Sequence, residues 1–96
     1  KIIFLYFYAN WCPICRVEVP QALFPAFNEL DEPNVIGFRV NYNDNETDAN
    51  EKALAEQFEI SYQHSKVILK NGKEVLKSLE TWEKERYLTE IQKATQ

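Results

Sequence analysis

The pattern of apolar and polar positions along the chain predicts four strands. Near its start, β-branched, aromatic and aliphatic residues follow one another without interruption (IIFLYFY), which is typical of a strand buried on both faces of a sheet. Asn71-Gly72 is a turn signal between two later runs, so these runs are expected to form a hairpin. The predicted strands are Ile2–Tyr8, Val35–Tyr42, Lys66–Leu69 and Glu74–Leu79.

After Cys12, apolar residues return at spacings of three and four, which predicts a helix. Its predicted apolar face consists of Val17, Pro20, Leu23, Phe24, Phe27 and Leu30. Pro20 is expected to kink this helix, because proline has no amide hydrogen to donate. The polar sequence DEPN from Asp31 to Asn34 is expected to end it.

Two further helices are predicted. Asp48 is expected to cap the first of them, with Glu51 completing a capping box. Its expected inner face consists of Ala53, Leu54 and Phe58. The last helix, from about Thr81, is expected to place Tyr87, Leu88, Ile91 and Ala94 on one face.

The elements follow the order βα-βα-ββα, which predicts an α/β fold. Helices between strands imply parallel pairing, and the hairpin adds an antiparallel edge. We therefore expect a central mixed sheet of four strands flanked by helices. A chain of 96 residues suits one domain, so residues 1–96 are expected to form a single unit. Because the chain lacks Met and opens directly on a strand, we expect an excised domain or a processed form.

Composition narrows the function. Hydrophobic residues make up 45% of the chain and charged residues 27%, which excludes a disordered protein. Eleven basic residues against fifteen acidic ones give a net charge of −4, which argues against nucleic-acid binding. No apolar run approaches the roughly 20 residues that span a bilayer, so we expect no membrane contact by this segment itself. We expect a monomer.

The chemistry-bearing residues are the two cysteines of the sequence WCPIC, Cys12 and Cys15. A structural disulfide would close a very short loop and constrain the unfolded chain little. A closed zinc site needs four ligands, and there is no second Cys pair. The motif follows a buried strand and opens a helix, with Pro13 suited to the first helical position. The positive end of the helix dipole would favour a Cys12 thiolate, so this placement favours a dithiol redox centre.

The sequence resembles the thioredoxin family. The stretch FYANWC from Phe7 to Cys12 is similar to the family's approach to its active site, F-x-A-x-W-C. Pro20 lies eight residues after Cys12, where thioredoxins carry a helix-kinking proline. The turn from Lys70 to Gly72 resembles their last hairpin. The resemblance covers nearly the whole chain, although the first strand and helix of full-length thioredoxins have no counterpart in it.

The resemblance implies a thioredoxin-like three-layer fold and a thiol–disulfide oxidoreductase. Cys12 would be the exposed attacking thiolate and Cys15 the buried resolving thiol. Its partners would be protein thiols and disulfides together with an unknown redox partner. No cofactor is expected beyond the Cys12–Cys15 disulfide. The implied substrate-binding residues are Trp11, Pro13, Ile14, Gln63 and His64. Trp11 would shield the motif and bind proteins, with plain core packing as the alternative.

Two departures from the family concern the redox pair. Tyr6 stands where many thioredoxins carry the buried acid that accepts a proton, so deprotonation of Cys15 would need another route, such as water. Glu18 is close in sequence, but we expect it in a solvated helix position. Pro13-Ile14 replaces the family's Gly-Pro. The proline-first order is similar to periplasmic disulfide oxidases, whereas Ile14 lacks their polar residue, so the direction of exchange stays open.

The third departure is His64, which aligns with the family's cis-proline opposite the cysteines. A trans Gln63–His64 bond is expected, because a cis bond there would cost about 2.5–4 kcal/mol. A protonated imidazole near Cys12 would favour its thiolate. Two thiolates and an imidazole also suit Cu(I) or Zn(II), and copper-delivery proteins of the Sco type, which share the fold, pair two Cys with one His. The alternative function is therefore a metal-binding or copper-delivery domain using Cys12, Cys15 and His64.

Two further interpretations remain. A redox-inert binding module would keep the fold, but the intact Cys pair speaks against it. The acidic stretch of Asp44, Glu46, Asp48 and Glu51 lacks the Gly and spacing of a calcium loop and is expected to be a solvated helix entrance. For location, we expect an extracytoplasmic domain, anchored through a segment outside this chain, over a cytoplasmic one.

Overall fold

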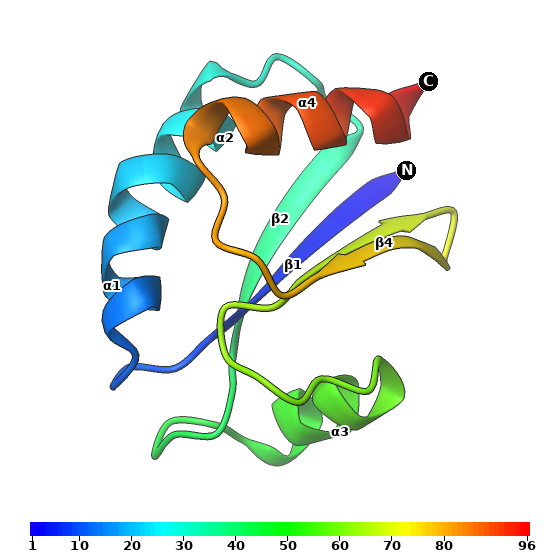
Figure 1. Ribbon diagram of the computed structural model, residues 1–96. Coiled ribbons are helices and arrows are strands. Elements are labelled where there is room, and N and C mark those ends of the chain that lie inside the picture. The colour runs from blue at the N-terminus through cyan, green and yellow to red at the C-terminus, as the bar shows by residue number, and fades with distance from the viewer.

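A mixed sheet of four strands, in the order β2-β1-β3-β4, forms the centre of the protein, as seen in a computed structural model that describes residues 1–96 (Figure 1). The inner strand β1 (Ile2–Tyr8) pairs in parallel with β2 (Val35–Asn41) and antiparallel with β3 (Lys66–Lys70). β4 (Lys73–Ser78) pairs antiparallel with β3 and forms the far edge. The four predicted strands are confirmed to within one residue at each end.

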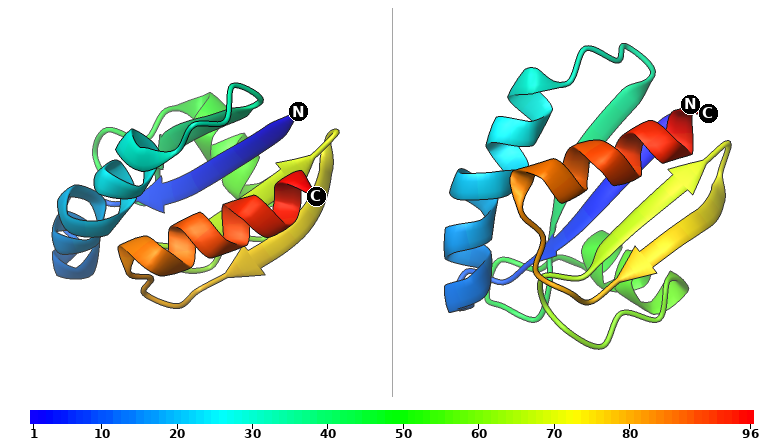
Figure 2. Two further views of the ribbon diagram at one scale, coloured as in Figure 1. Left: turned by 90° about the horizontal axis from the view of Figure 1, so that it is seen from above. Right: turned by 45° about the horizontal axis from the view of Figure 1, so that its top comes forward.

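Helices cover both faces of the sheet, which gives the expected three layers (Figure 2). Three helical segments follow β1 without a break: α1 (Pro13–Glu18), η1 (Val19–Leu23) and α2 (Phe24–Glu29). They share one face with α4 (Lys84–Thr95), and the larger apolar cluster lies there. α3 (Ala49–Gln57) covers the opposite face over a smaller cluster. The predicted α/β architecture is confirmed.

The predicted kink at Pro20 takes the form of a π-helical turn, η1. Proline cannot donate to the carbonyl four residues earlier, and its ring clashes with that carbonyl. A π turn relieves this by joining residues five apart, and the N–H of Phe24 bonds to the carbonyl of Val19. The helix therefore widens at Pro20 and continues into α2.

The inner face of this helical stretch differs from the predicted one. Val17 and Phe24 are both about half exposed. The buried positions are Cys15, Glu18, Val19, Ala22, Leu23 and Ala26. One reason is that a carboxylate, Glu18, occupies an inner position and interrupts the apolar pattern. The other is that the π turn adds a residue to the helical turn, which changes the residues after it that face the sheet. On α3, Ala53 is exposed, and Ala55 takes the inner position.

Other local predictions are confirmed. The Asp48 side chain accepts from the Glu51 amide across 2.8 Å, and the Glu51 side chain accepts from the Asp48 amide across 3.0 Å, which completes the capping box. Asn71 and Gly72 have φ values of 53° and 83°, in the left-handed region that such hairpin turns require. α4 begins at Lys84, three residues later than expected, and buries the predicted face around Tyr87 and Ile91. None of the helices has the length and apolar character needed to cross a membrane.

Candidate functional site

The two cysteines lie where the chain leaves β1 and enters α1. Cys12 is the N-cap residue of α1, and Pro13 is its first residue, as predicted. The backbone N–H of Cys15 donates to the Sγ atom of Cys12 across 3.2 Å, and both cysteines are free thiols. A donated amide and the positive end of a helix dipole both stabilise negative charge on a sulfur atom, so this geometry distinguishes Cys12 from Cys15.

The Cys12 sulfur is not exposed, so this part of the prediction is wrong. Cys12 is 1% exposed and Cys15 has no exposed surface. As the N-cap residue, Cys12 turns its side chain inward to the Cys15 amide, where it joins the larger apolar cluster. The two residues between the cysteines, Pro13 and Ile14, are exposed instead. Pro13 and Ile14, and not the two cysteine side chains, therefore form the surface of the motif.

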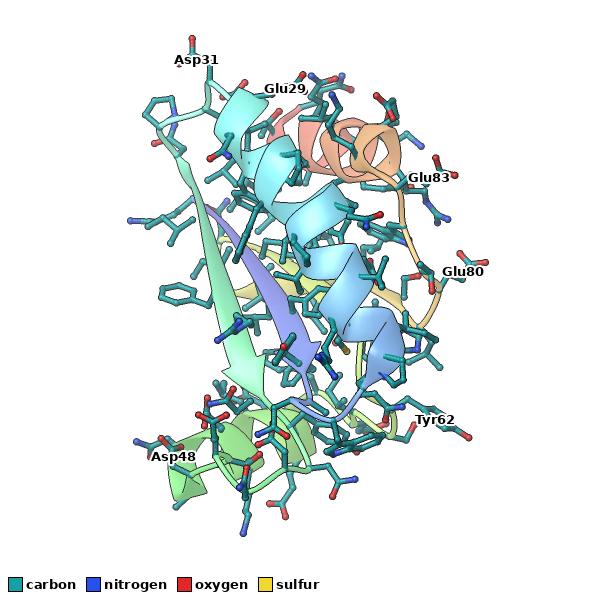
Figure 3. The ribbon with its side chains drawn as sticks, turned by 90° about the vertical axis from the view of Figure 1, so that its left-hand side faces the viewer. Glu29, Asp31, Asp48, Tyr62, Glu80 and Glu83 are labelled. Carbon is teal, nitrogen blue, oxygen red and sulfur yellow. The ribbon has the colours of Figure 1, made fainter.

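Exposed apolar side chains surround the motif. Trp11 is 49% exposed and Tyr62 is 58% exposed, and Ile14 and Val17 are 44% and 53% exposed. The Trp11 Nε1–H donates to the carbonyl of Asn43 across 2.8 Å, which fixes the indole on a surface loop. The alternative of core packing for Trp11 is therefore wrong. Figure 3 shows Tyr62 at the end of the molecule where α1 begins.

A buried carboxylate lies one helical turn after Cys15. Glu18 is 3% exposed, so the expected solvated position is wrong. The Tyr6 hydroxyl donates to its Oε1 atom and the Trp82 backbone N–H to its Oε2 atom, each across 3.1 Å. The Tyr87 hydroxyl also donates to Oε2. A charged side chain is tolerated in the interior when donors converge on it in this way.

Lys66 supplies the opposite charge. It has no exposed surface, and its Nζ atom lies 2.7 Å from Oε2 of Glu18. The ammonium group also donates to the backbone carbonyls of His64, across 2.9 Å, and of Glu80. Burial lowers the pKa of Lys66, and the hydrogen bond and charge of Glu18 oppose that effect. Removing one partner of such a buried pair typically costs about 3–5 kcal/mol.

Cys15 faces the same cluster. Burial, followed by the neighbouring Cys12 side chain, raises the pKa of the Cys15 thiol to about 11. Burial, together with the negative charge of Glu18, raises the pKa of Tyr6, which therefore stays a neutral phenol. The buried carboxylate thus comes from α1, and Tyr6 of β1, which donates to it, shares an apolar cluster with Cys15.

The loop of Gln63 and His64 lies beside the end of β1. The His64 N–H donates to the carbonyl of Phe7 across 2.7 Å, and the Gln63–His64 bond is trans, as expected. His64 has a φ of 58°. Burial, followed by the positive charge of Lys66, lowers the pKa of His64, which favours the neutral imidazole at pH 7. No hydrogen bond joins Gln63 or His64 to either sulfur atom.

Nothing in the structure favours the metal-binding alternative. The Nδ1 atom of His64 is buried without a hydrogen-bond partner, as a ligand atom could be. However, no group of three Cys, His, Asp or Glu side chains is placed to hold a metal ion. The acidic stretch instead orders its own loop, since the Asp44 carboxylate accepts from the Asn10 amide across 2.8 Å and from the Thr47 hydroxyl across 2.9 Å.

Sequence reasoning missed the cluster that Glu18, Lys66 and Tyr87 form. One available signal is that Glu18 follows Cys15 by three residues, and positions three apart share a helix face. A second is that Lys66 opens a strand predicted to be buried. Two opposite charges on inward-facing positions of packed elements are expected to pair.

Solved structures with a similar fold include thioredoxins. Trxlp from Edwardsiella tarda EIB202 is 28% identical, with a TM-score of 0.72 over 94% of this chain and 80% of that one. Thioredoxin f from spinach chloroplast is 23% identical, with a TM-score of 0.76 over 100% and 78% of the two chains. Thioredoxin from Aeropyrum pernix is 21% identical, with a TM-score of 0.74 over 97% and 74%. No family model and no curated protein matches the chain. The chain has the thioredoxin fold, which confirms the resemblance.

Proposed function

We propose that this thioredoxin-fold domain is a thiol–disulfide oxidoreductase that acts on proteins through Cys12 and Cys15. The observation that carries the proposal is the hydrogen bond from the Cys15 amide to the Cys12 sulfur at the start of α1. It places two free thiols one helical turn apart and gives them different environments. The thioredoxin neighbours support this kind of redox chemistry.

The exchange proceeds in two steps. The Cys12 thiolate attacks one sulfur of a substrate disulfide, which forms a Cys12–substrate disulfide and releases the other sulfur as a thiolate. Cys15 then loses its proton and attacks the Cys12 sulfur, which forms the Cys12–Cys15 disulfide and releases the second substrate thiolate. Two electrons pass from the cysteine pair to the substrate, and the reverse sequence oxidises a dithiol. The cysteine pair needs no other cofactor for either direction.

The surface around the motif suits a polypeptide partner. Trp11, Ile14, Val17 and Tyr62 are each between 44% and 58% exposed and have few polar atoms. Apolar side chains that project from the surface around a reactive pair offer contact area to an extended chain, and aromatic residues are enriched in such interfaces. Protein thiols and disulfides are therefore the proposed substrate class.

The test is to trap the intermediate. A Cys15→Ser variant lacks the resolving thiol, so it should accumulate a disulfide between Cys12 and a protein substrate, visible by non-reducing electrophoresis and mass spectrometry. The matched control is a variant with both cysteines replaced by Ser, which should form no adduct. If Cys15→Ser forms no more adduct than the control with any protein disulfide, the proposed function is wrong.

A further inference from the structure

The two edge strands of the sheet differ in how well they resist pairing with another strand (Figure 1). β4 carries Lys73, Glu74 and Lys77, and the register of its pairing with β3 shifts within the strand, as at a β-bulge. Charged side chains and bulges keep an edge strand from adding a further strand. β2 has neither protection, because Arg39 is its only charged residue and its pairing with β1 is regular over all 7 residues.

Alternate residues of β2 turn their backbone groups away from β1. The N–H of Tyr42, just after the strand, donates to the carbonyl of Tyr8 across 2.8 Å. Because backbone groups alternate in direction along a strand, the even-numbered residues of β2 face β1 and the odd-numbered ones face outward. The outward N–H groups at the two ends of the strand, those of Val35 and Asn41, have partners outside the sheet.

Gly37 and Arg39 lie between these ends, and no hydrogen bond uses their outward N–H and C=O groups. Gly37 has no side chain to cover the edge, and the ring of Phe27 lies 2.8 Å from the position that a Cβ atom would take there. The guanidinium group of Arg39 is held over the ring of Tyr8, 4.4 Å from the ring centre. Phe38, between the two, is 52% exposed. This edge is therefore open to another strand.

We propose that the outer edge of β2 pairs antiparallel with the same edge of a second copy of this chain, about a two-fold axis at Phe38. In this register, Gly37 of each copy lies opposite Arg39 of the other. Residues that face each other in this way exchange both of their N–H···O=C bonds. Every free donor and acceptor of Gly37 and Arg39 then has a partner, and the two sheets become one.

The side chains of this edge complement one another in that register. Phe38 meets Phe38 of the second copy as a pair without hydrogen bonds, in which Cβ atoms lie about 4.5–5.5 Å apart and two aromatic rings stabilise the contact. On the other face, Arg39 lies opposite Gly37 of the second copy, where no side chain competes for the space. A hollow of about 190 Å³ beside Gly37, lined by Phe24 and Phe27, offers aromatic rings to this cation.

The expected dimer is weak and closed. One strand edge is small against the roughly 1,200–2,000 Å² that stable interfaces bury, so the dimer should dissociate on dilution. The charged edge at β4 does not pair, so the assembly stops at two copies. Cys12 follows the carboxyl end of β1, which is parallel to β2, so the two cysteine motifs lie at opposite ends of the joined sheet. This proposal departs from the monomer expected from the sequence.

Sedimentation velocity of the reduced protein over a range of concentrations measures the association, and a reductant excludes dimers linked by disulfides. The natural chain should pass from the mass of one chain to that of two as the concentration rises. Phe38→Lys places like charges opposite each other at the axis and should raise the dissociation constant at least about tenfold. Val75→Lys is the matched control, because Val75 lies on β4 and is also 52% exposed, and it should leave the constant unchanged.

A second pair of variants tests the backbone bonds and decides the matter if Phe38→Lys does not fold. Arg39→Pro removes the outward N–H without breaking a bond to β1, whereas Arg39→Ala removes the side chain and keeps that N–H. The proline should abolish the dimer while circular dichroism shows a folded domain, and the alanine should weaken it much less. In the natural chain, hydrogen exchange of the Gly37 and Arg39 amides should slow as the concentration rises, while the Phe38 amide, bonded to β1, stays protected throughout.

Three results would overturn the proposal. The first is a natural chain that remains a single copy at its highest soluble concentration, which would leave the β2 edge to a strand of a different protein. The second is a dimer that Val75→Lys breaks and Phe38→Lys does not, because the contact would then lie on β4. The third is a dimer equally stable in Arg39→Pro and Arg39→Ala, because its contact would not use the backbone of β2.

Discussion

Cys12 and Cys15 are both buried, yet their surroundings differ in the feature that matters for exchange. Cys12 accepts the N–H of Cys15, which stabilises a thiolate. The pKa of Cys15 is raised to about 11 by burial and by its neighbour. Since thiolates attack disulfides, this difference supports the proposed assignment of Cys12 as the attacking residue.

Selective alkylation tests this difference. At pH 8, only about one Cys15 side chain in a thousand is ionised, given its pKa of about 11. Brief treatment of the reduced protein with iodoacetamide should therefore label Cys12 at least about tenfold more than Cys15. Peptide mass spectrometry measures the ratio, with the denatured protein as the control for equal reactivity. Preferential labelling of Cys15 would reverse the assigned roles.

His64 offers a prediction on the acid side of neutrality. It is the only histidine of the chain, and its folded pKa is lowered by burial and by Lys66. A lowered pKa contributes stability above the unfolded value of about 6.5, and that contribution is lost as the pH falls through the folded pKa. NMR titration should give a folded pKa below that of the urea-unfolded chain. The free energy of unfolding should fall between pH 7 and 5 more in the natural chain than in His64→Gln, and an equal fall would contradict this account.

The sequence predicts the position of a residue correctly where the residue belongs to one contiguous motif. Trp11, Cys12, Pro13 and Cys15 lie where the sequence predicts, because a strand end and a helix start are local features. Glu18 was misplaced, because a carboxylate on a helix is normally solvated and its partners come from other elements. The burial of Cys12 also depends on a side-chain direction that spacing does not reveal.

At the level of elements, the π turn is the feature that decides which helix residues face the sheet. η1 lies between α1 and α2, and the buried positions around it are Glu18, Val19 and Ala22. The proline at its centre was readable from the sequence, but the resulting change of phase was not. A kink and a π turn can both accommodate the missing amide hydrogen of proline. Which of the two forms depends on the packing of the helix against the rest of the protein.

Replacing Pro20 tests what the π turn does. Pro20→Ala restores an amide, so the segment should close towards a regular helix and the free energy of unfolding should change. Proline destabilises a regular helix interior by about 3 kcal/mol. The free energy of unfolding should therefore rise in the variant, but by less than this amount, because the native turn has adapted to the proline. The cysteines should remain competent for exchange, with a changed rate if the kink positions the Cys12 turn over the sheet. Denaturation measures the free energy of unfolding, and the rate at which the reduced protein reduces a disulfide measures exchange. If a structure of the variant shows an unchanged helix axis and the exchange rates are also unchanged, the π turn has no role in positioning the cysteines.

For the whole molecule, the sheet brings four distant segments to one place. Tyr6 comes from β1, Glu18 from α1, Lys66 from β3 and Tyr87 from α4. The alternation of strands and helices was sufficient to predict this sheet and its two layers of helices. It was not sufficient to predict the polar cluster, because side-chain pairing across elements depends on register and helix phase. The cysteine pair therefore follows from a local motif, whereas the buried polar cluster follows from the tertiary fold.

The most direct test of the central claim is a redox equilibrium of the domain in glutathione buffers. After acid quenching and alkylation, mass spectrometry counts the thiols at each ratio of reduced to oxidised glutathione. The account predicts one reversible two-electron transition between two free thiols and the Cys12–Cys15 disulfide, with about 30 mV for each tenfold change in the equilibrium constant. A Cys15→Ser control should stop at a single glutathione adduct on Cys12. Failure to form the Cys12–Cys15 disulfide at any ratio, or a stable glutathione adduct in its place, would contradict the claim that these residues form an exchange centre.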